Sequence, residues 1–427
     1  MQGQALPGFR DFYPEELALR NHIFTTWRDV ARRYGFQEYD GPPLEPLDLY
    51  TQKSGDEIVQ QLYGFRDKGD REVALRPEMT PTLARMVGAR AQALKKPIRW
   101  FSIPQLFRYE RQQRGRLREH FQLNMDIIGE AGPAADAEIM AAVIDIARAF
   151  GLGPKQVRLR VSDRRIVVAE LTQRFGVREE QVPAVLSALD KWERDPAATE
   201  RQLAAVLDGA PEQRASVHGF LQALGKAQGR PDPGLMQSPS AGPLTECLRR
   251  LSDMGLEEFV DVDLQIVRGL AYYTGIVFEL FDAKQTLRAV CGGGRYDNLI
   301  KEITGVDLPC VGFGMGDVVL GELLRELGSD VEAPSQLDAF LIAVGGEDVP
   351  FVLKLAHELR GRDVAVEYAL RQAPIRKQLE LAAARGAPRA VIVGPDERKA
   401  KVALVRDLKT GTQRKVPLTK VRKGVFK

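Results

Sequence analysis

The segment FRYERQQRGRLREHFQLNMDIIG, Phe107 to Gly129, concentrates residues that could do chemistry. Arg108 and Glu110 are two positions apart, so on a strand they would share one face. Four further arginines follow in a loop, and a second apolar stretch brings back Gln122 and Asp126. The pattern predicts a hairpin with a basic tip and a floor of mixed charge. A solvated basic hairpin is the alternative interpretation.

A second segment, IVRGLAYYTGIVFEL from Ile266 to Leu280, reads mostly as a buried strand. It nevertheless contains Arg268 and the adjacent pair Tyr272 and Tyr273. A guanidinium is rarely fully buried unless an anionic group meets it. Arg268 is therefore expected to hold a bound anion, or else to bridge to a structural carboxylate.

A third segment, LRPEMTPTLARM, carries Arg76, Glu78 and Thr80 and resembles a helix start with Thr80 as its cap. Together the three segments hold many guanidiniums, a few carboxylates among apolar residues, and no obvious nucleophile or acid–base histidine. That inventory suits catalysis by positioning and charge stabilisation. Nucleotidyl or phosphoryl transfer fits it best.

Several other kinds of site are disfavoured by spacing. CGGGRYD and GFGMGD lack the P-loop pattern, and Asp317 stands where a GxGxxG fingerprint starting at Gly312 needs glycine. These glycines are expected to permit close backbone approach in strands or turns. Three cysteines and four histidines show no ligand spacing, so neither a protein-bound metal site nor a disulfide framework is predicted.

The elements that position these residues fall into two parts. A helix over about 15–34 and apolar runs without helices between them predict an α+β body with mostly antiparallel strands. Breakpoints lie at 225–243 and 327–336, and the Ala/Leu/Glu/Arg-rich stretch from about 164 to 224 predicts an inserted helical piece. After 336, strands alternate with helices, which predicts a small α/β domain with a mixed or parallel sheet.

Charge is divided unevenly along the 427 residues, whose net charge is +3. From Pro334 onward 19 Lys+Arg face 10 Asp+Glu, an excess of nine positive charges. A basic tail on an acidic body suggests a polyanionic partner, although a merely basic solvated surface is the alternative. No apolar run is long enough to span a membrane and no secretory signal is visible, so a cytoplasmic location is expected.

These segments resemble those of histidyl-tRNA synthetases over essentially the whole chain. GFQEYDGPPLEP is similar to class II motif 1, with Pro42 at the motif proline, and the arginine-rich hairpin is similar to motif 2. VRGLAYYTGIVFEL and GGGRYD resemble the two histidine-specific signatures, and APRAVIVG a class IIa anticodon-binding domain. The resemblance implies a class II catalytic domain over 1–326, with its helical insertion at about 164–245, and an anticodon-binding domain over 334–427.

The same resemblance implies an activity: ATP-dependent ligation of L-histidine to tRNA(His) through histidyl-adenylate, with Mg²⁺, in a cytoplasmic homodimer without membrane contact. Arg268 and Arg108 would be catalytic. Histidine would be bound by Glu78, Met79, Thr80, Arg108, Gln122, Asp126, Arg268, Tyr272, Tyr273 and Tyr296. ATP would be bound by Arg108, Glu110, Arg116 and His120.

The chain also departs from the family pattern. Motif 3 normally ends in an arginine for the γ-phosphate, but Asp317, Val318 and Val319 follow Gly316. Arg114, Arg116 or Mg²⁺ could compensate. Two smaller departures are Ala271, where many relatives carry Asp, and His120, where an aromatic residue is expected to stack on adenine. The missing arginine is the feature that favours the alternative function, a catalytically impaired paralogue acting as a histidine-sensing or regulatory subunit.

Overall fold

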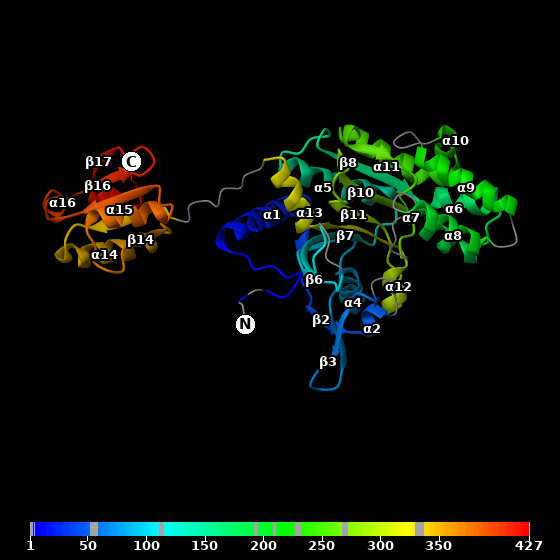
Figure 1. Cartoon of the computed structure of the whole chain (residues 1–427), viewed down its shortest axis with the longest axis horizontal. Helices are drawn as coiled ribbons and strands as arrows, with labels where there is room; N and C mark the ends of the chain where they lie inside the picture. The colour runs from blue at the N-terminus through cyan, green and yellow to red at the C-terminus, as the bar shows by residue number, and fades with distance from the viewer. Residues whose placement is uncertain are drawn as a thin grey trace. The chain divides into compact units, whose positions relative to one another are not determined.

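The computed structural model describes residues 3, 5–51, 59–110, 115–191, 195–207, 211–226, 232–266, 272–328 and 337–426. The predictions for Arg114, Arg268 and Ala271 therefore lie outside the described residues. The chain forms two compact units, Met1–Val331 and Glu332–Lys427, and each is described by itself (Figure 1).

A nine-stranded sheet organises the N-terminal unit. Its order is β1-β5-β7-β12-β11-β10-β8-β9, with β6 paired to β7 beside this path. The β1–β5 and β8–β9 pairs are parallel and the other pairs are antiparallel, so the mostly antiparallel sheet is confirmed. The strands are β1 Gln37–Glu38, β5 Ile98–Ser102, β6 Gln105–Phe107, β7 Glu119–Ile128, β8 Val157–Asp163, β9 Val260–Val262, β10 Ile276–Asp282, β11 Cys291–Arg295 and β12 Cys310–Gly316.

Alternation along the central strands separates a core face from a polar face. In β12 and in the second half of β7, every second residue is apolar and belongs to the main core: Leu123, Met125, Ile127, Val311, Phe313 and Met315. That core includes Trp27 of α1 and much of α5, and α5 contacts β7 and β12. Figure 1 shows α1, α5 and α13 gathered together in this unit. These helices are α1 Pro14–Arg33, α5 Pro133–Ala149 and α13 Asp317–Glu326.

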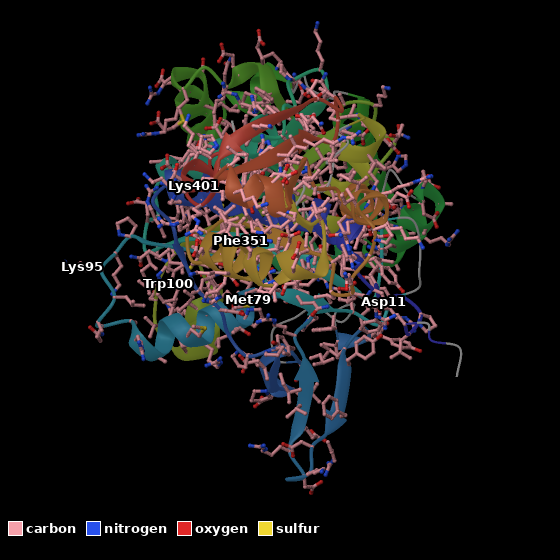
Figure 2. All side chains as sticks on the ribbon, turned by 90° about the vertical axis from the view of Figure 1, so that its left-hand side faces the viewer. Asp11, Met79, Lys95, Trp100, Phe351 and Lys401 are labelled. Atoms are coloured by element: carbon pink, nitrogen blue, oxygen red, sulfur yellow. The ribbon has the colours of Figure 1, made fainter. Side chains whose placement is uncertain are left out.

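On the opposite face of the sheet, α4 and α12 pack against each other around a second core that includes Leu83 and Ile300. A small sheet in the order β2-β4-β3 projects from this region in both overall views (Figures 1 and 2). The bounds of these elements are α2 Asp48–Thr51, α4 Thr80–Arg90, α12 Leu299–Thr304, β2 Leu44–Pro46, β3 Tyr63–Arg66 and β4 Glu72–Leu75.

The predicted insertion after β8 is helical. Its apolar side chains, among them Leu186, Leu203 and Leu221, join the main core. Its elements are α6 Arg164–Ala169, a π-helical turn Glu170–Arg174, α7 Val182–Lys191, α8 Pro196–Val206, α9 Pro211–Lys226, α10 Pro233–Met236, α11 Gly242–Asp253, and short 3₁₀ turns at Glu179–Gln181, Pro239–Ala241 and Glu257–Phe259.

The C-terminal unit carries a five-stranded mixed sheet in the order β14-β13-β15-β16-β17. β13 pairs in parallel with β14 and β15, whereas β16 pairs antiparallel with β15 and β17 antiparallel with β16. The predicted α/β domain with a mixed sheet is confirmed. The elements are β13 Ala339–Ala343, a 3₁₀ turn Gly346–Asp348, α14 Val349–Arg360, β14 Val366–Tyr368, α15 Ile375–Ala384, β15 Arg389–Val393, α16 Pro395–Lys399, β16 Val402–Asp407, β17 Gln413–Pro417 and α17 Leu418–Val421.

Two local predictions were wrong. The strand read across 266–280 begins only at Ile276, because the Thr274 amide donates to the Arg295 carbonyl at 2.8 Å and the chain turns before β10. Tyr272 and Tyr273 thus precede the strand. Thr80 does not cap its helix: it is the first residue of α4, and Met79 occupies the cap position without a side-chain hydrogen bond.

Among the described residues, no helix combines the length and the apolarity that a membrane crossing requires.

Candidate active site

Two adjoining cavities open on the polar face of the sheet. The smaller has a volume of about 180 Å³ and the larger about 600 Å³. Arg108, Gln122, Gly292 and Gly314 line both, so the cavities meet at these residues. The geometry can hold a small polar molecule next to a larger one, with the Arg108 guanidinium at their junction.

The floor of the small cavity follows from strand alternation. Gln122, Asn124 and Asp126 are every second residue of β7, and all three line the cavity. Across the strand pair, Gly312 lies opposite Asp126 in register. A Cβ on Gly312 would lie 1.9 Å from Asp126 Oδ1, and a Cβ on Gly314 would lie 2.7 Å from the Gln122 side chain. Gly312 and Gly314 therefore make room for polar side chains of the neighbouring strand, in agreement with the close approach expected of these glycines.

Asp126 is a buried acid at the floor of the small cavity. It is 5% exposed, and it accepts a hydrogen bond from the Tyr296 hydroxyl. Burial raises the pKa of Asp126 to about 7, although the bond from Tyr296 opposes the shift. Burial and the nearby Asp126 together raise the pKa of Tyr296 well above its usual value, so this hydroxyl keeps its proton. The pair offers a hydrogen-bond acceptor and a hydroxyl to a ligand.

The opposite wall is aromatic and acidic. The Tyr272 hydroxyl donates to Glu78 Oε2 at 3.2 Å, and its ring centroid lies 5.2 Å from that of Tyr273 and 5.8 Å from that of Tyr296. Glu78 is 5% exposed, and its carboxylate at the cavity wall suits a cationic group such as an ammonium.

The arginine-rich hairpin forms one side of the large cavity. Its stem is closed by the Arg108 amide, which donates to the Arg118 carbonyl at 3.0 Å. Arg108 Nε donates to the Pro77 carbonyl at 2.9 Å, which holds the guanidinium at the junction. Arg116 Nε lies 3.0 Å from Glu110 Oε2, and Arg108 Nη1 lies 3.9 Å from Glu110 Oε1. One carboxylate thus lies within ion-pair distance of two guanidiniums.

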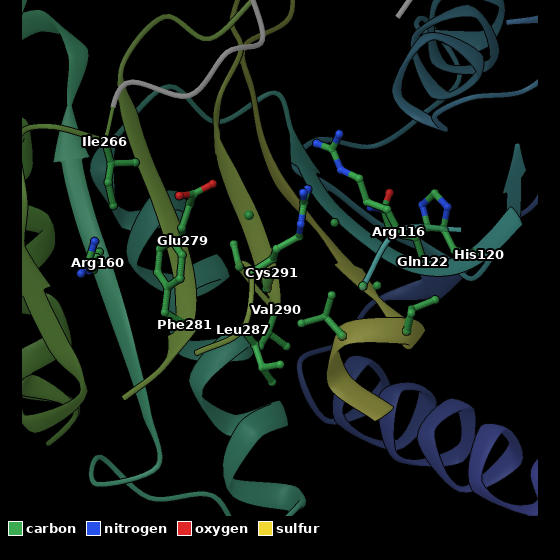
Figure 3. Close-up of a pocket in the computed structure, with 18 of the residues that line it drawn as sticks. Arg116, His120, Gln122, Arg160, Ile266, Glu279, Phe281, Leu287, Val290 and Cys291 are labelled. Carbon is green, nitrogen blue, oxygen red and sulfur yellow. The ribbon is translucent and has the colours of Figure 1, made fainter. Parts of the chain in front are cut away.

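His120 lies on the same side of the large cavity (Figure 3). Burial, together with the positive charges of Arg108 and Arg10, lowers the pKa of His120 to about 3. The imidazole is therefore neutral at physiological pH and can stack on a flat ring without adding charge.

The far wall of the large cavity consists of residues that the sequence did not single out. Arg160 Nη1 lies 3.4 Å from Asp263 Oδ2, and the Arg160 guanidinium sits 4.9 Å from the centroid of the Phe281 ring. Glu279 turns its carboxylate into the space that faces Arg116 and His120 (Figure 3). Glu279 could have been predicted from the alternation of side chains along β10, and Asn124 from the same alternation along β7. Gln265, Gln285 and Arg288 are further polar residues of this cavity that the sequence did not single out.

Asp317, at the motif 3 departure, is a structural anchor. It is 5% exposed; its Oδ2 accepts from Arg10 Nη1 at 2.9 Å and its Oδ1 from the Phe121 amide at 2.9 Å. Arg10 Nε also donates to Glu119 at 2.6 Å. The N-terminal segment, β7 and α13 are thereby joined beside the large cavity. Burial raises the pKa of Asp317, against the lowering effect of Arg10.

The predicted binding residues are distributed as follows. Met79 is fully buried, with Arg76 Nη1 3.8 Å from its sulfur, and it does not line either cavity in the described part of the chain. Arg268 lies outside the described residues. The small cavity is lined by Glu78, Thr80, Arg108, Gln122, Asp126, Tyr272, Tyr273 and Tyr296, and the large one by Arg108, Glu110, Arg116 and His120.

Metal-ligating side chains are not clustered in the described ranges: no three or more His, Cys, Asp or Glu residues there are arranged to hold an ion. The cysteines Cys247, Cys291 and Cys310 are buried.

Sequence comparison identifies relatives over nearly the full length. A model of the family "Histidyl-tRNA synthetase" matches residues 8–316, and a model of the "Anticodon binding domain" matches residues 338–426. The chain is 46% identical over 424 residues to a protein of Opitutus terrae named histidine–tRNA ligase. That match covers 98% of this chain and 97% of the relative.

Comparison with solved structures gives the same fold. The histidyl-tRNA synthetase of Nostoc sp. PCC 7120 superposes with a TM-score of 0.79 at 24% identity, covering 99% of each chain. A protein from Bacillus halodurans C, described as an ATP phosphoribosyltransferase regulatory subunit/histidyl-tRNA synthetase, superposes with a TM-score of 0.73 at 21% identity, covering 92% of this chain and 99% of that one. At these identities the likeness concerns the fold alone.

Proposed function

The chain belongs to the histidyl-tRNA synthetase family, and from that premise we propose how its own residues ligate L-histidine to tRNA(His) with ATP. One observation carries the assignment of roles: a small cavity with an acidic, aromatic lining joins a large arginine-lined cavity, and Arg108 stands at the junction. Histidine would occupy the small cavity and ATP the large one. The histidine carboxylate and the α-phosphate would then meet at Arg108.

Histidine would be selected through its imidazole. Asp126, with its partner Tyr296, would accept an N–H of the ring, and Tyr273 would complete the ring pocket. A substrate without matching ring nitrogens would leave buried polar atoms unpaired, a loss that can reach ~10⁴–10⁵ in discrimination. Glu78, Thr80 and Gln122 would hold the α-ammonium group.

Adenylation would proceed by positioning and charge neutralisation. A carboxylate oxygen of histidine attacks the α-phosphorus and forms a new P–O bond, while the bond from that phosphorus to the α,β-bridging oxygen breaks. The electron pair leaves with pyrophosphate. Arg108, held in place by the Pro77 carbonyl, would neutralise charge on the α-phosphate. Arg268, from the family resemblance, is assigned to the same phosphate.

The rest of the ATP molecule would lie along the hairpin. Arg116, oriented by Glu110, would contact phosphate, and the neutral His120 ring would stack on the adenine. Mg²⁺ bound to ATP would neutralise phosphate charge and polarise the phosphoryl oxygens. Because Mg²⁺ commonly takes only one or two protein carboxylates beside substrate phosphates, the Glu279 carboxylate at this cavity fits the ion.

In the second step, a ribose hydroxyl at the 3′ end of tRNA(His) attacks the carbonyl carbon of the adenylate. The carbon–oxygen bond to AMP breaks and the hydroxyl proton is released. We assign catalysis to residues 1–326, with the insertion at about 164–245, and anticodon binding to residues 334–427, whose excess of positive charge suits RNA. A homodimer through motif 1 and a cytoplasmic location complete the proposal.

The test is histidine-dependent exchange of pyrophosphate into ATP by the purified full-length protein, compared across all twenty amino acids. Exchange with histidine alone, followed by charging of tRNA(His), is the expected result. Histidine binding without exchange would instead support the sensing or regulatory alternative, for which the absent motif 3 arginine is the motivating observation.

A further inference from the structure

The motif 3 departure leaves an aliphatic side chain at the wall of the large cavity. Val319, where the family resemblance leads us to expect an arginine, lies in the first turn of α13. It is 8% exposed and lines the cavity together with Gly316 and Val318. If ATP is to be used here, the positive charge for its terminal phosphates must come from another element.

Arg288 lines the same cavity from the connection between β10 and β11. A Cβ placed on Gly115, at the hairpin, would lie 3.4 Å from Val319 Cγ2 and 3.7 Å from Arg288 Cδ. Both side chains therefore pack around one backbone position. The end of the aliphatic stem of Arg288 thus lies at the same glycine as the valine, and Arg288 is exposed where it lines the cavity.

The β10–β11 connection is fixed rather than loosely tethered. The buried Asp282 carboxylate accepts from the Thr286 amide at 3.0 Å, from the Thr286 hydroxyl at 3.1 Å and from the Leu287 amide at 3.0 Å. Further along, the Val290 amide donates to the Leu280 carbonyl at 2.8 Å. Leu287 and Val290 belong to the main core. Arg288 is thus anchored on both sides, as a preorganised charge must be.

We infer, on the basis of the proposed ATP-dependent reaction, that Arg288 takes the place of the motif 3 arginine. Its guanidinium contacts the β- and γ-phosphates of ATP and stabilises the negative charge that leaves with pyrophosphate. A planar guanidinium can bind two phosphate oxygens at once, and a rigid connection holds it where that charge develops. The cation thus comes from the neighbouring strand connection rather than from α13, and it lines the same cavity.

The inference is testable with four variants of the full-length protein. Arg288→Ala should reduce kcat/KM for ATP in pyrophosphate exchange by about 10²-fold, as expected for the loss of one preorganised donor. Arg288→Lys should fall between this variant and the wild type, because charge remains and the two-point contact is lost. Lys284→Ala is the matched control: it removes an exposed cation from the same connection but not from the cavity. It should behave as wild type.

The fourth variant, Arg288→Ala with Val319→Arg, returns a guanidinium to the motif 3 position. It should recover at least ~10-fold of the lost kcat/KM, since its charge enters the same cavity. Recovery would not occur if Arg288 merely stabilised its own connection. A double variant that fails to recover any activity, although histidine binding shows it to be folded, would count against the replacement.

Binding measurements separate this inference from the proposed function. In equilibrium dialysis, Arg288→Ala should weaken ATP binding by at least ~10-fold and leave AMP binding unchanged, because AMP lacks the β- and γ-phosphates. Equal weakening of both nucleotides, or unchanged ATP binding, would overturn the role of Arg288. Wild-type protein without any exchange would refute the ligase proposal, whereas the comparison of ATP with AMP would still decide where Arg288 acts.

Discussion

Replacing Asp126 with asparagine should stabilise the folded protein at alkaline pH while weakening its binding of histidine. The buried carboxylate costs free energy when it ionises, and that cost disappears with the neutral amide. The same carboxylate is the proposed acceptor for the histidine ring, and the amide replaces one of its two acceptor oxygens with a donor. Stability and function should therefore move in opposite directions at this one residue.

The magnitude follows from the pKa of Asp126, raised from 3.8 to about 7 by burial. Between these two values the folded protein keeps a proton that the unfolded chain has lost, so wild-type stability falls as the pH rises through this window. From about pH 4.5 to about pH 8 the loss is about 3 kcal/mol. Asparagine does not titrate, so the advantage of the variant should grow by that amount over the same range. An unpaired amide N–H could lower the absolute gain by about 1–3 kcal/mol without changing this slope.

Urea unfolding followed by tryptophan fluorescence is the appropriate assay. All three tryptophans of the chain belong to the N-terminal unit, so the signal reports on the unit that contains the cavity. Asp29→Asn, an exposed carboxylate on α1, is the matched control and should show no pH-dependent difference from the wild type. In parallel, the KM for histidine in pyrophosphate exchange should rise by ~10²-fold in the Asp126→Asn variant.

A difference in stability between Asp126→Asn and the wild type that stays constant across the pH range would refute this account, because it would mean that Asp126 does not titrate within the window. If the stability changed as expected but the KM for histidine did not, the two claims would separate. Asp126 would then be a buried acid that titrates in this range, but it would have no role in recognising histidine.

Three further predictions concern the glycine floor, the hairpin and the tail. Gly312→Ala should raise the KM for histidine by at least ~10-fold and lower the free energy of unfolding by about 1–3 kcal/mol, because its Cβ would overlap the Asp126 carboxylate. Gly219→Ala is the control, since no atom lies near the Cβ that it adds. If both variants changed KM and stability equally, the packing argument would be wrong. His120→Phe should keep kcat/KM for ATP within about threefold and leave the pH dependence of kcat/KM unaltered, because the imidazole is already neutral. If the variant lost a pH-dependent step near neutral pH, His120 would be a titrating group in the wild type and this prediction would be wrong. Deleting residues 334–427 should leave exchange intact but weaken tRNA binding, which in the full-length protein should fall steeply with salt in a filter-binding assay.

Local periodicity was sufficient for much of the fold. Strand alternation in QLNMDII predicted a hairpin strand with polar residues on one face, and β7 has this form. The change from period two to helical spacing after residue 336 predicted the mixed sheet of the C-terminal unit. These signals are readable because they arise between residues only two to four positions apart.

Two features depended on contacts that local periodicity does not encode. Tyr272 and Tyr273 lie in a turn because the Thr274 amide pairs with the distant Arg295 carbonyl. Likewise, Asp317 is an anchor because Arg10 and the Phe121 amide converge on it from other segments. Apolar composition around these residues gave no sign of either contact.

By itself, the sequence determined the chemistry available: guanidiniums, a few carboxylates, and glycines where strands must carry large polar neighbours. Only the tertiary structure decided which of them share a cavity, and it brought Arg288 and Val319 to the same glycine, Gly115. The physical reason is that side-chain type and alternation are local properties, whereas the proximity of a strand connection to a helix start depends on how the whole sheet closes around its core.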